Sequence, residues 1–143
     1  MNTLGNTPKT ICKIAEAYSI NNGFVSATVL QRGTMVKLTP TGEVAPIAAV
    51  TDRPLGLVVA GSRTAGDEVT VQTEFNALVR CTADGDIVTA DELAVSGIDN
   101  ANEKLTQYKK AVATNFVSGM ALSDAADGEN VWVGIYRTST VKA

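Results

Sequence analysis

The sequence predicts an all-β protein, either a small antiparallel β-barrel or a jelly-roll-like sandwich. Apolar residues recur at every second position in several short runs, which is the spacing of half-buried strands. Turn residues, mainly Gly, Asp and Asn, separate these runs at regular intervals. Glycine is frequent, with 12 residues, and aromatic residues make up only 5% of the chain. This composition favours strands and tight turns over a helical bundle.

The bulk properties predict one domain and exclude several kinds of partner. A length of 143 residues suits a single β domain over residues 24–143, preceded by an extended amino-terminal arm over residues 1–23. The formal net charge of −3 provides no broad basic field for nucleic acid. No apolar run reaches the roughly 20 residues of a membrane helix. The polar amino terminus lacks the apolar segment of a signal peptide, so we expect synthesis in a cytoplasm.

The arm contains one segment with two interpretations. Ile11, Ile14, Ala15 and Tyr18 follow helical spacing, and Thr10 could cap such a helix. The same residues could instead form an edge strand.

Short strands follow from Phe24 onwards. The expected strands of the first half are Phe24–Leu30, Met35–Leu38 and Glu43–Val50, the last interrupted by Pro46, which suits an edge strand or a bulge. The clearest element is a hairpin from Pro54 to Thr73. Leu55, Leu57 and Val59 alternate along its first strand, residues 61–66 form the turn, and Val69 and Val71 alternate along its second strand.

The second half has weaker signals. We expect strands at Ala77–Cys81, Ile87–Thr89 and Lys104–Tyr108, a loop at Ala90–Asn102, a second hairpin at Val117–Tyr136, and a polar tail from Arg137. This hairpin resembles the first, which suggests an internal repeat of residues 33–73 and 85–136. The matched pairs are Gly56 with Gly119, Gly66 with Gly128, Val69 with Val131, and Val71 with Val133. Chance alignment of glycine-rich β sequences is the alternative.

The two hairpins differ in one useful way. The strand around Val69 and Val71 has a polar second face, whereas the strand around Val131 and Val133 carries Trp132 and Tyr136 on that face. A strand that is apolar on both faces is covered on both. Trp and Tyr are frequent anchors of protein interfaces, although they could equally cap the core of one subunit.

The residues that usually perform catalysis are scarce. The chain has no histidine, which removes Ser-His-Asp and Cys-His catalysis and most zinc sites. The glycine-rich turn at residues 61–66 lacks the Gly-Lys-Ser/Thr ending of a phosphate-binding loop. Cys12 and Cys81 are predicted to be free, buried thiols, and a disulfide between them is the alternative. We therefore assign no catalytic, cofactor-binding or metal-binding residue.

Acidic residues offer two further candidates. Asp84 and Asp86 could form the carboxylate pair of a hydrolase, but Asp and Gly at residues 84–86 more simply meet the needs of a turn. The oxygen ligands of Asp99, Asn100, Asn102 and Glu103 would suit calcium, but they lack the order of an EF-hand loop.

Six segments resemble one known family. They are Gly33–Leu38 (GTMVKL), Pro54–Ala60 (PLGLVVA), Gly66–Val71 (GDEVTV), Gly85–Ala90 (GDIVTA), Ser118–Leu122 (SGMAL) and Gly128–Val133 (GENVWV). In this order they resemble the head decoration, or cement, proteins of tailed bacteriophages, and the likeness spans roughly residues 24–136.

The resemblance implies a role and no reaction. Such proteins sit on the outer surface of an expanded phage head as small homo-oligomers, more often trimers than dimers, and bridge neighbouring major capsid subunits. The expected partners are thus the major capsid protein and other copies of this chain. The candidate contact residues are Thr3, Ile11, Ile14 and Tyr18 in the arm, with Trp132 and Tyr136 on the second hairpin. The alternatives are a tail or baseplate β-domain, a glycan-binding module, or a small hydrolase using Asp84 and Asp86.

Overall fold

The computed structural model describes residues 11–14, 24–73, 76–102, 104–136 and 140–143, and these contain strands and no helix. The strands are β1 (Ile11–Ile14), β2 (Phe24–Val25), β3 (Met35–Leu38), β4 (Val44–Pro46), β5 (Gly56–Ala60), β6 (Glu68–Gln72), β7 (Asn76–Ala83), β8 (Glu92–Asp99), β9 (Leu105–Lys110), β10 (Gly119–Ala121) and β11 (Asn130–Tyr136). The all-β prediction is confirmed.

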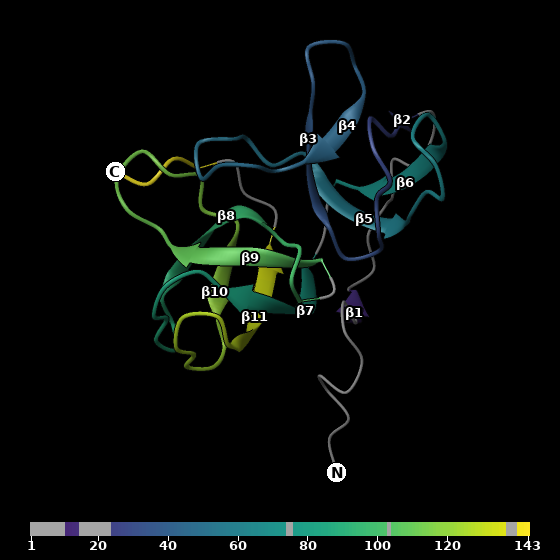
Figure 1. Cartoon of the computed structure of the whole chain (residues 1–143). Coiled ribbons are helices and arrows are strands. Elements are labelled where there is room, and N and C mark those ends of the chain that lie inside the picture. Colours follow the sequence, from purple (N-terminus) through teal and green to yellow (C-terminus); the bar gives the residue numbers. More distant parts are fainter. Residues whose placement is uncertain (1–10, 15–23, 74–75, 103, 137–139) are drawn as a thin grey trace.

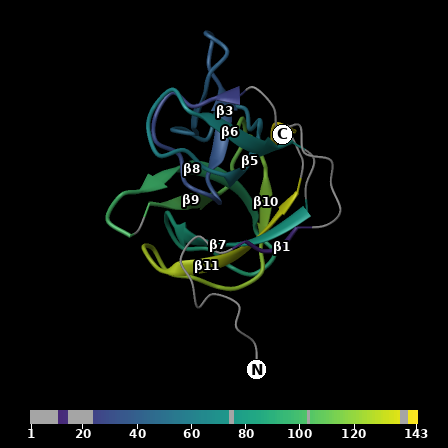
Figure 2. The ribbon, with the colours of Figure 1, turned by 90° about the vertical axis from the view of Figure 1, so that its right-hand side faces the viewer.

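The second half of the chain forms a small barrel. Strands β7, β11, β10, β8 and β9 are hydrogen-bonded in that order. A parallel pairing of Thr82 with Gln107 and of Ala83 with Tyr108 joins β7 to β9 and closes the barrel. Strand β1 lies antiparallel against the amino-terminal part of β7 (Figures 1 and 2). Closure pairs the strand edges with one another and leaves few of them free.

The first half has the same strand order with shorter strands. Strands β2, β6, β5, β3 and β4 are neighbours in that order, and a parallel bridge between Ser26 and Val44 joins its two ends. Figure 1 shows this first barrel at one end of the molecule and the second barrel at the other. The two halves are thus related barrels in tandem, with β2–β6 corresponding to β7–β11.

Hydrogen bonds establish the correspondence residue by residue. Val58 donates its N–H to the Thr34 oxygen at 2.9 Å and accepts from the Gly33 N–H at 2.8 Å. Ala121 makes the same two bonds, at 2.9 Å to the Asp91 oxygen and 2.8 Å from the Ala90 N–H. The counterpart of Gly33 is therefore Ala90. Both residues have a positive φ, 89° and 74°.

This result corrects one part of the alignment made from sequence. The repeat expected from sequence begins at Gly33 in the first copy and at Gly85 in the second, but Gly85 occupies a different turn five residues earlier than Ala90. The pairs between the two hairpins hold, since Leu57 opposite Gln72 corresponds to Met120 opposite Gly134. The turn before β6 also matches, because Gly66 and Gly128 donate to the oxygens of Ser26 and Ala83.

Each barrel has its own buried core, and the same positions form both. The first core contains Leu30, Val36, Val44, Val58, Val69 and Val71. The counterparts in the second barrel, all buried, are Ile87, Leu93, Tyr108, Ala121, Val131 and Val133. In the second barrel, the large Tyr108 stands at the position of Val44, and the small Ala121 stands at the position of Val58. The gain in side-chain volume at the first position offsets the loss at the second.

The prediction of a loop at residues 90–102 is wrong. Strand β8 fills most of this segment and pairs with both β9 and β10. Its Leu93 and Val95 do alternate and are buried, but the pairing register shifts between Val95 and Gly97. Such a bulge breaks the two-residue period from which a strand is read.

Other predicted boundaries were too long or too short. The strand expected at Phe24–Leu30 is limited to Phe24 and Val25 plus the Ser26 bridge, and the one expected at Ile87–Thr89 is a single bridge from Ile87 to Ala125. In the arm, Ile11–Ile14 is the edge strand and not the start of a helix. Thr3 and Tyr18 lie outside the described residues.

The thiol of Cys81 is free and lies in the second core, completely buried. Burial without a charged partner raises the pKa of this thiol, because the thiolate would lose its hydration. In a Cys12→Ser variant, we expect a thiol reagent to label the folded protein at least about 100-fold more slowly than the unfolded protein. Equal labelling rates with and without denaturant would contradict this burial.

Candidate interaction surface

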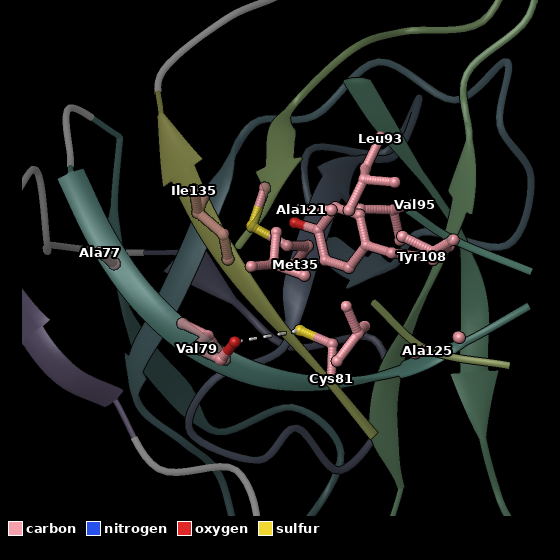
Figure 3. Packing of buried hydrophobic residues seen from close by; sticks show 14 of the residues in the cluster. Met35, Ala77, Val79, Cys81, Leu93, Val95, Tyr108, Ala121, Ala125 and Ile135 are labelled. Carbon is pink, nitrogen blue, oxygen red and sulfur yellow. Dashed lines mark hydrogen bonds between the residues drawn. The ribbon is translucent and has the colours of Figure 1, made fainter. Parts of the chain in front are cut away.

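The two barrels meet at a buried apolar interface. Met35, Ile47 and Leu57 belong to the first barrel, but they are buried in one cluster with the core of the second. Met35 and Leu57 point away from their own core, because Val36 and Val58 beside them point inward. Figure 3 shows Met35 among the labelled residues Ile135, Ala121 and Tyr108 of the second barrel.

Two hydrogen bonds cross the same contact. The Thr106 hydroxyl donates to the carbonyl oxygen of Gly33 at 3.2 Å in a buried position. The N–H of Phe116 donates to the Val50 oxygen at 2.9 Å. The Val50 side chain packs against a small cluster of Ala94, Ala111 and Val117. Apolar packing and satisfied polar groups together make this a fixed junction.

The second barrel exposes the surface that corresponds to this junction. Leu57 is fully buried, whereas its counterpart Met120 is 41% exposed. The counterpart of Met35 is Glu92, whose carboxylate accepts from the Lys142 ammonium at 2.7 Å. Nothing in the described part of the chain covers Met120 as the second barrel covers Leu57.

Met120 lies in a wider apolar area that we call the β10–β11 face, made of Leu78, Met120, Leu122 and Trp132 around Gly134. Met120 is directly opposite Gly134, and Trp132 is directly opposite Arg80. A Cβ on Gly134 would lie 3.5 Å from the Leu122 side chain, so Leu122 extends over this glycine. Leu122 is 46% exposed and Trp132 is half-buried. A half-buried Trp beside exposed aliphatic residues is typical of a protein contact surface.

The structure brings only part of the predicted contact set to this face. Trp132 is central to it, and the backbone of Tyr136 lies on the same strand opposite Asn76. The backbones of Ile11 and Ile14 lie opposite Val79 and Ala77, on the other side of β7 from β11. Sequence reasoning missed Met120 and Leu122. Their signal was present in the run Ser118–Leu122, where apolar residues occupy both faces of a short strand.

Two of the acidic candidates, Asp86 and Asp99, accept hydrogen bonds from backbone N–H groups in turns, and Glu103 lies outside the described residues. The Gly85 N–H donates to the Asp127 carboxylate at 2.8 Å, and the Asp127 N–H donates to the Asp86 carboxylate at 3.1 Å. Asp99 accepts from the N–H of Ala101 at 3.1 Å. These bonds hold backbone N–H groups at loop ends. Among the described residues, no group of three or more Cys, Asp and Glu is placed to hold a metal ion.

Several carboxylates have lowered pKa values because they accept such bonds. The backbone N–H groups of Thr64, Val88 and Thr89 lower the pKa of Asp67, Asp91 and Asp124 respectively. For Asp52, burial raises the pKa, but bonds from Lys37 and from the N–H groups of Ala48 and Ala49 outweigh it and lower the pKa.

These shifts predict acid sensitivity. A carboxylate whose folded pKa lies below its unfolded value of about 3.9 stabilises the protein at higher pH and loses that effect as pH falls through the folded pKa. We expect the free energy of unfolding to be flat from about pH 5 to 8 and to fall below about pH 4. Urea titrations across this range measure it, and stability that rises on acidification would contradict the assignment.

Asp52→Asn tests the contribution of one of these carboxylates to the acid sensitivity. Its counterpart Asn115 already accepts the Val112 N–H at 3.0 Å with an amide oxygen, so an amide can keep this turn closed. We expect a cost of at most about 1 kcal/mol at neutral pH, from the lost ion pair with Lys37, and a smaller loss of stability in acid.

No known protein family matches this chain, and no curated protein matches it significantly. The described residues include no helix long and apolar enough to cross a membrane.

Proposed function

We propose that this chain is a structural virion protein that binds the outside of a bacteriophage head and cements neighbouring major capsid subunits. In this role it stabilises the shell against the pressure of packed DNA. Its partners are the major capsid protein and other copies of itself, most simply as a trimer, and it performs no reaction. The observation that carries the proposal is the family resemblance of six segments spread over both barrels.

The place of those segments in the fold supports the proposal. Four of the six fall on matched elements of the two barrels: Pro54–Ala60 contains β5 and Ser118–Leu122 contains its counterpart β10, while Gly66–Val71 leads into β6 and Gly128–Val133 leads into its counterpart β11. A resemblance confined to turns would be weak, because Gly and Asp recur in all turns. Here it also includes the buried strand residues that specify the barrels.

The physical properties of the molecule suit a brace. Two barrels joined through a buried junction would suit the transmission of force between neighbouring subunits. The β10–β11 face offers apolar area on one side of the molecule for contact with protein. Many identical copies on one shell would add modest individual affinities by multivalency.

The first experiment uses expanded heads that lack the protein. Purified chain should co-sediment with these heads at a saturating stoichiometry and raise the temperature at which they rupture. Failure to bind any head preparation would refute the proposal. Fractionation of intact virions separates this proposal from a tail, baseplate or glycan-binding role, since the protein should follow the heads.

A further inference from the structure

The barrel–barrel junction joins two unlike surfaces. The first barrel contributes the outer face of β3 and β5, with Met35 and Leu57 at its centre. The second contributes what we call its receiving end, which contains Val95, Thr106 and Tyr108. Val95 and Tyr108 are buried in one cluster with Met35, and Thr106 donates to Gly33. A contact between unlike surfaces differs from the self-complementary contact of a twofold dimer.

Because the barrels are related, each chain carries a second copy of both surfaces. The outer face of the second barrel has Met120 at the position of Leu57, and its exposed fraction is 41% against 0%. The receiving end of the first barrel has Leu38 at the position of Val95, and its exposed fraction is 52% against 3%. At these two positions, the buried residue of the junction has an apolar and exposed counterpart where that junction is not made.

We propose that these two surfaces bind each other between chains, so that the β10–β11 face of one copy docks on the Leu38 end of the next copy. The occupant is a second copy of this chain because the docking surface repeats one that already binds the related barrel. The resulting contact is head-to-tail. Head-to-tail contacts give a closed ring when the rotation between copies closes, and an open chain otherwise.

One replacement sets the strength of this contact. Met35, which enters the junction, has Glu92 as its counterpart, and Glu92 remains at the surface in an ion pair with Lys142. A carboxylate cannot enter an apolar barrel end without a large desolvation cost. Elsewhere on the same face the apolar area is larger, since Trp132 and Leu122 occupy the positions of Thr70 and Val59. The contact between chains is thus weaker than the internal junction and reversible, and it depends on protein concentration.

This inference deepens the self-association in the proposed function and is tested without any phage head. Its failure would leave head binding open, and failure of head binding would leave the self-association intact. The measurement is sedimentation velocity of the full chain over a wide concentration range. We expect mass to rise with concentration towards a defined oligomer.

Two single substitutions block one surface each. Met120→Lys places a charge in the β10–β11 face, and Leu38→Lys places one at the receiving end. Both positions are exposed, so both variants should fold with the melting temperature of the parent. Each should weaken self-association at least about tenfold. Val88→Lys is the matched control, because Val88 is 59% exposed and lies on neither surface; its association should match the parent's.

Mixing the two blocked variants is the decisive step. Each retains the surface that the other has lost, so an equimolar mixture should form a one-to-one dimer and nothing larger. Glu92→Met, which recreates the apolar face of the first barrel, should tighten association at least about tenfold. Leu122→Lys offers a second block of the same face should Met120→Lys misfold.

Several results would overturn the proposal. A parent chain that stays monomeric at every concentration excludes the contact. Loss of association in Met120→Lys but not in Leu38→Lys indicates a twofold contact through one face. Association unchanged in both variants places the interface elsewhere, and a mixture that yields no dimer refutes the pairing of the two surfaces.

Discussion

Met35→Glu is expected to lower the free energy of unfolding by at least about 3 kcal/mol, and it could prevent folding altogether. Met35 is 1% exposed and lies between the two barrels, where a carboxylate would lose its water among the mainly apolar side chains of the described cluster and gain no cation there to pair with. Denaturant titration monitored by Trp132 fluorescence and by circular dichroism measures the loss. A change below about 1 kcal/mol would show that the barrels do not close on this side chain.

The matched control is the reciprocal substitution at the related position. Glu92→Met removes an exposed ion pair with Lys142, and such pairs contribute little, so its effect on unfolding should stay within about 1 kcal/mol. The same two residue types are thus exchanged at equivalent positions with very different outcomes. Similar changes in the free energy of unfolding for Met35→Glu and Glu92→Met would contradict the assignment of Met35 as buried and Glu92 as exposed.

Gly56→Ala should cost about 2–4 kcal/mol, and Gly119→Ala about 1–3 kcal/mol. A Cβ on Gly56 would overlap the backbone oxygen of Gln72 and lie 2.8 Å from Val71 Cγ1. A Cβ on Gly119 would lie 2.7 Å from Val133 Cγ1 and 3.2 Å from the Gly134 oxygen. These are equivalent sites, where each hairpin needs close approach of two strands. The overlap with backbone is harder to relieve than the overlap with a side chain, so Gly56 is the more sensitive site.

Gly134→Ala is the control for that pair. Its added Cβ would meet only the Leu122 side chain at 3.5 Å, an ordinary contact at the surface. We expect a change within about 0.5 kcal/mol by the same denaturant titration. Equal sensitivity at all three glycines would mean that the loss reflects general strand propensity and not the close approach of strands.

The sequence predicted the fold class and the hairpins well because these depend on local pattern. The run from Pro54 to Thr73 carries a two-residue period and a glycine-rich turn, and both strands appear where expected. The prediction failed at β8, where the bulge after Val95 interrupts the period and the surrounding acids and glycine imitate a loop. Strand pairing overrides such local signals.

The candidate surface was only partly readable from the sequence. Trp132 stands out because aromatic residues are rare in this chain. Met120, Leu122 and Leu38 do not, since an apolar residue in a short strand is normally buried. Their meaning emerges only when the two barrels are matched position by position, which shows that Met120 and Leu38 are exposed where Leu57 and Val95 are buried. That comparison needs the hydrogen-bond register of the strands. The repeat bounds read from sequence placed Gly85 at the position of Gly33, whereas the register places Ala90 there.

The most direct test of a capsid-cementing role is a cryo-EM map of the phage particle that carries this protein, at a resolution that distinguishes strands. The proposal predicts pairs of small barrels on the outer shell, each bridging neighbouring major capsid subunits and repeated around symmetry axes. A map that places the two-barrel density in the tail or inside the shell, or a purified particle without it, would contradict the proposal.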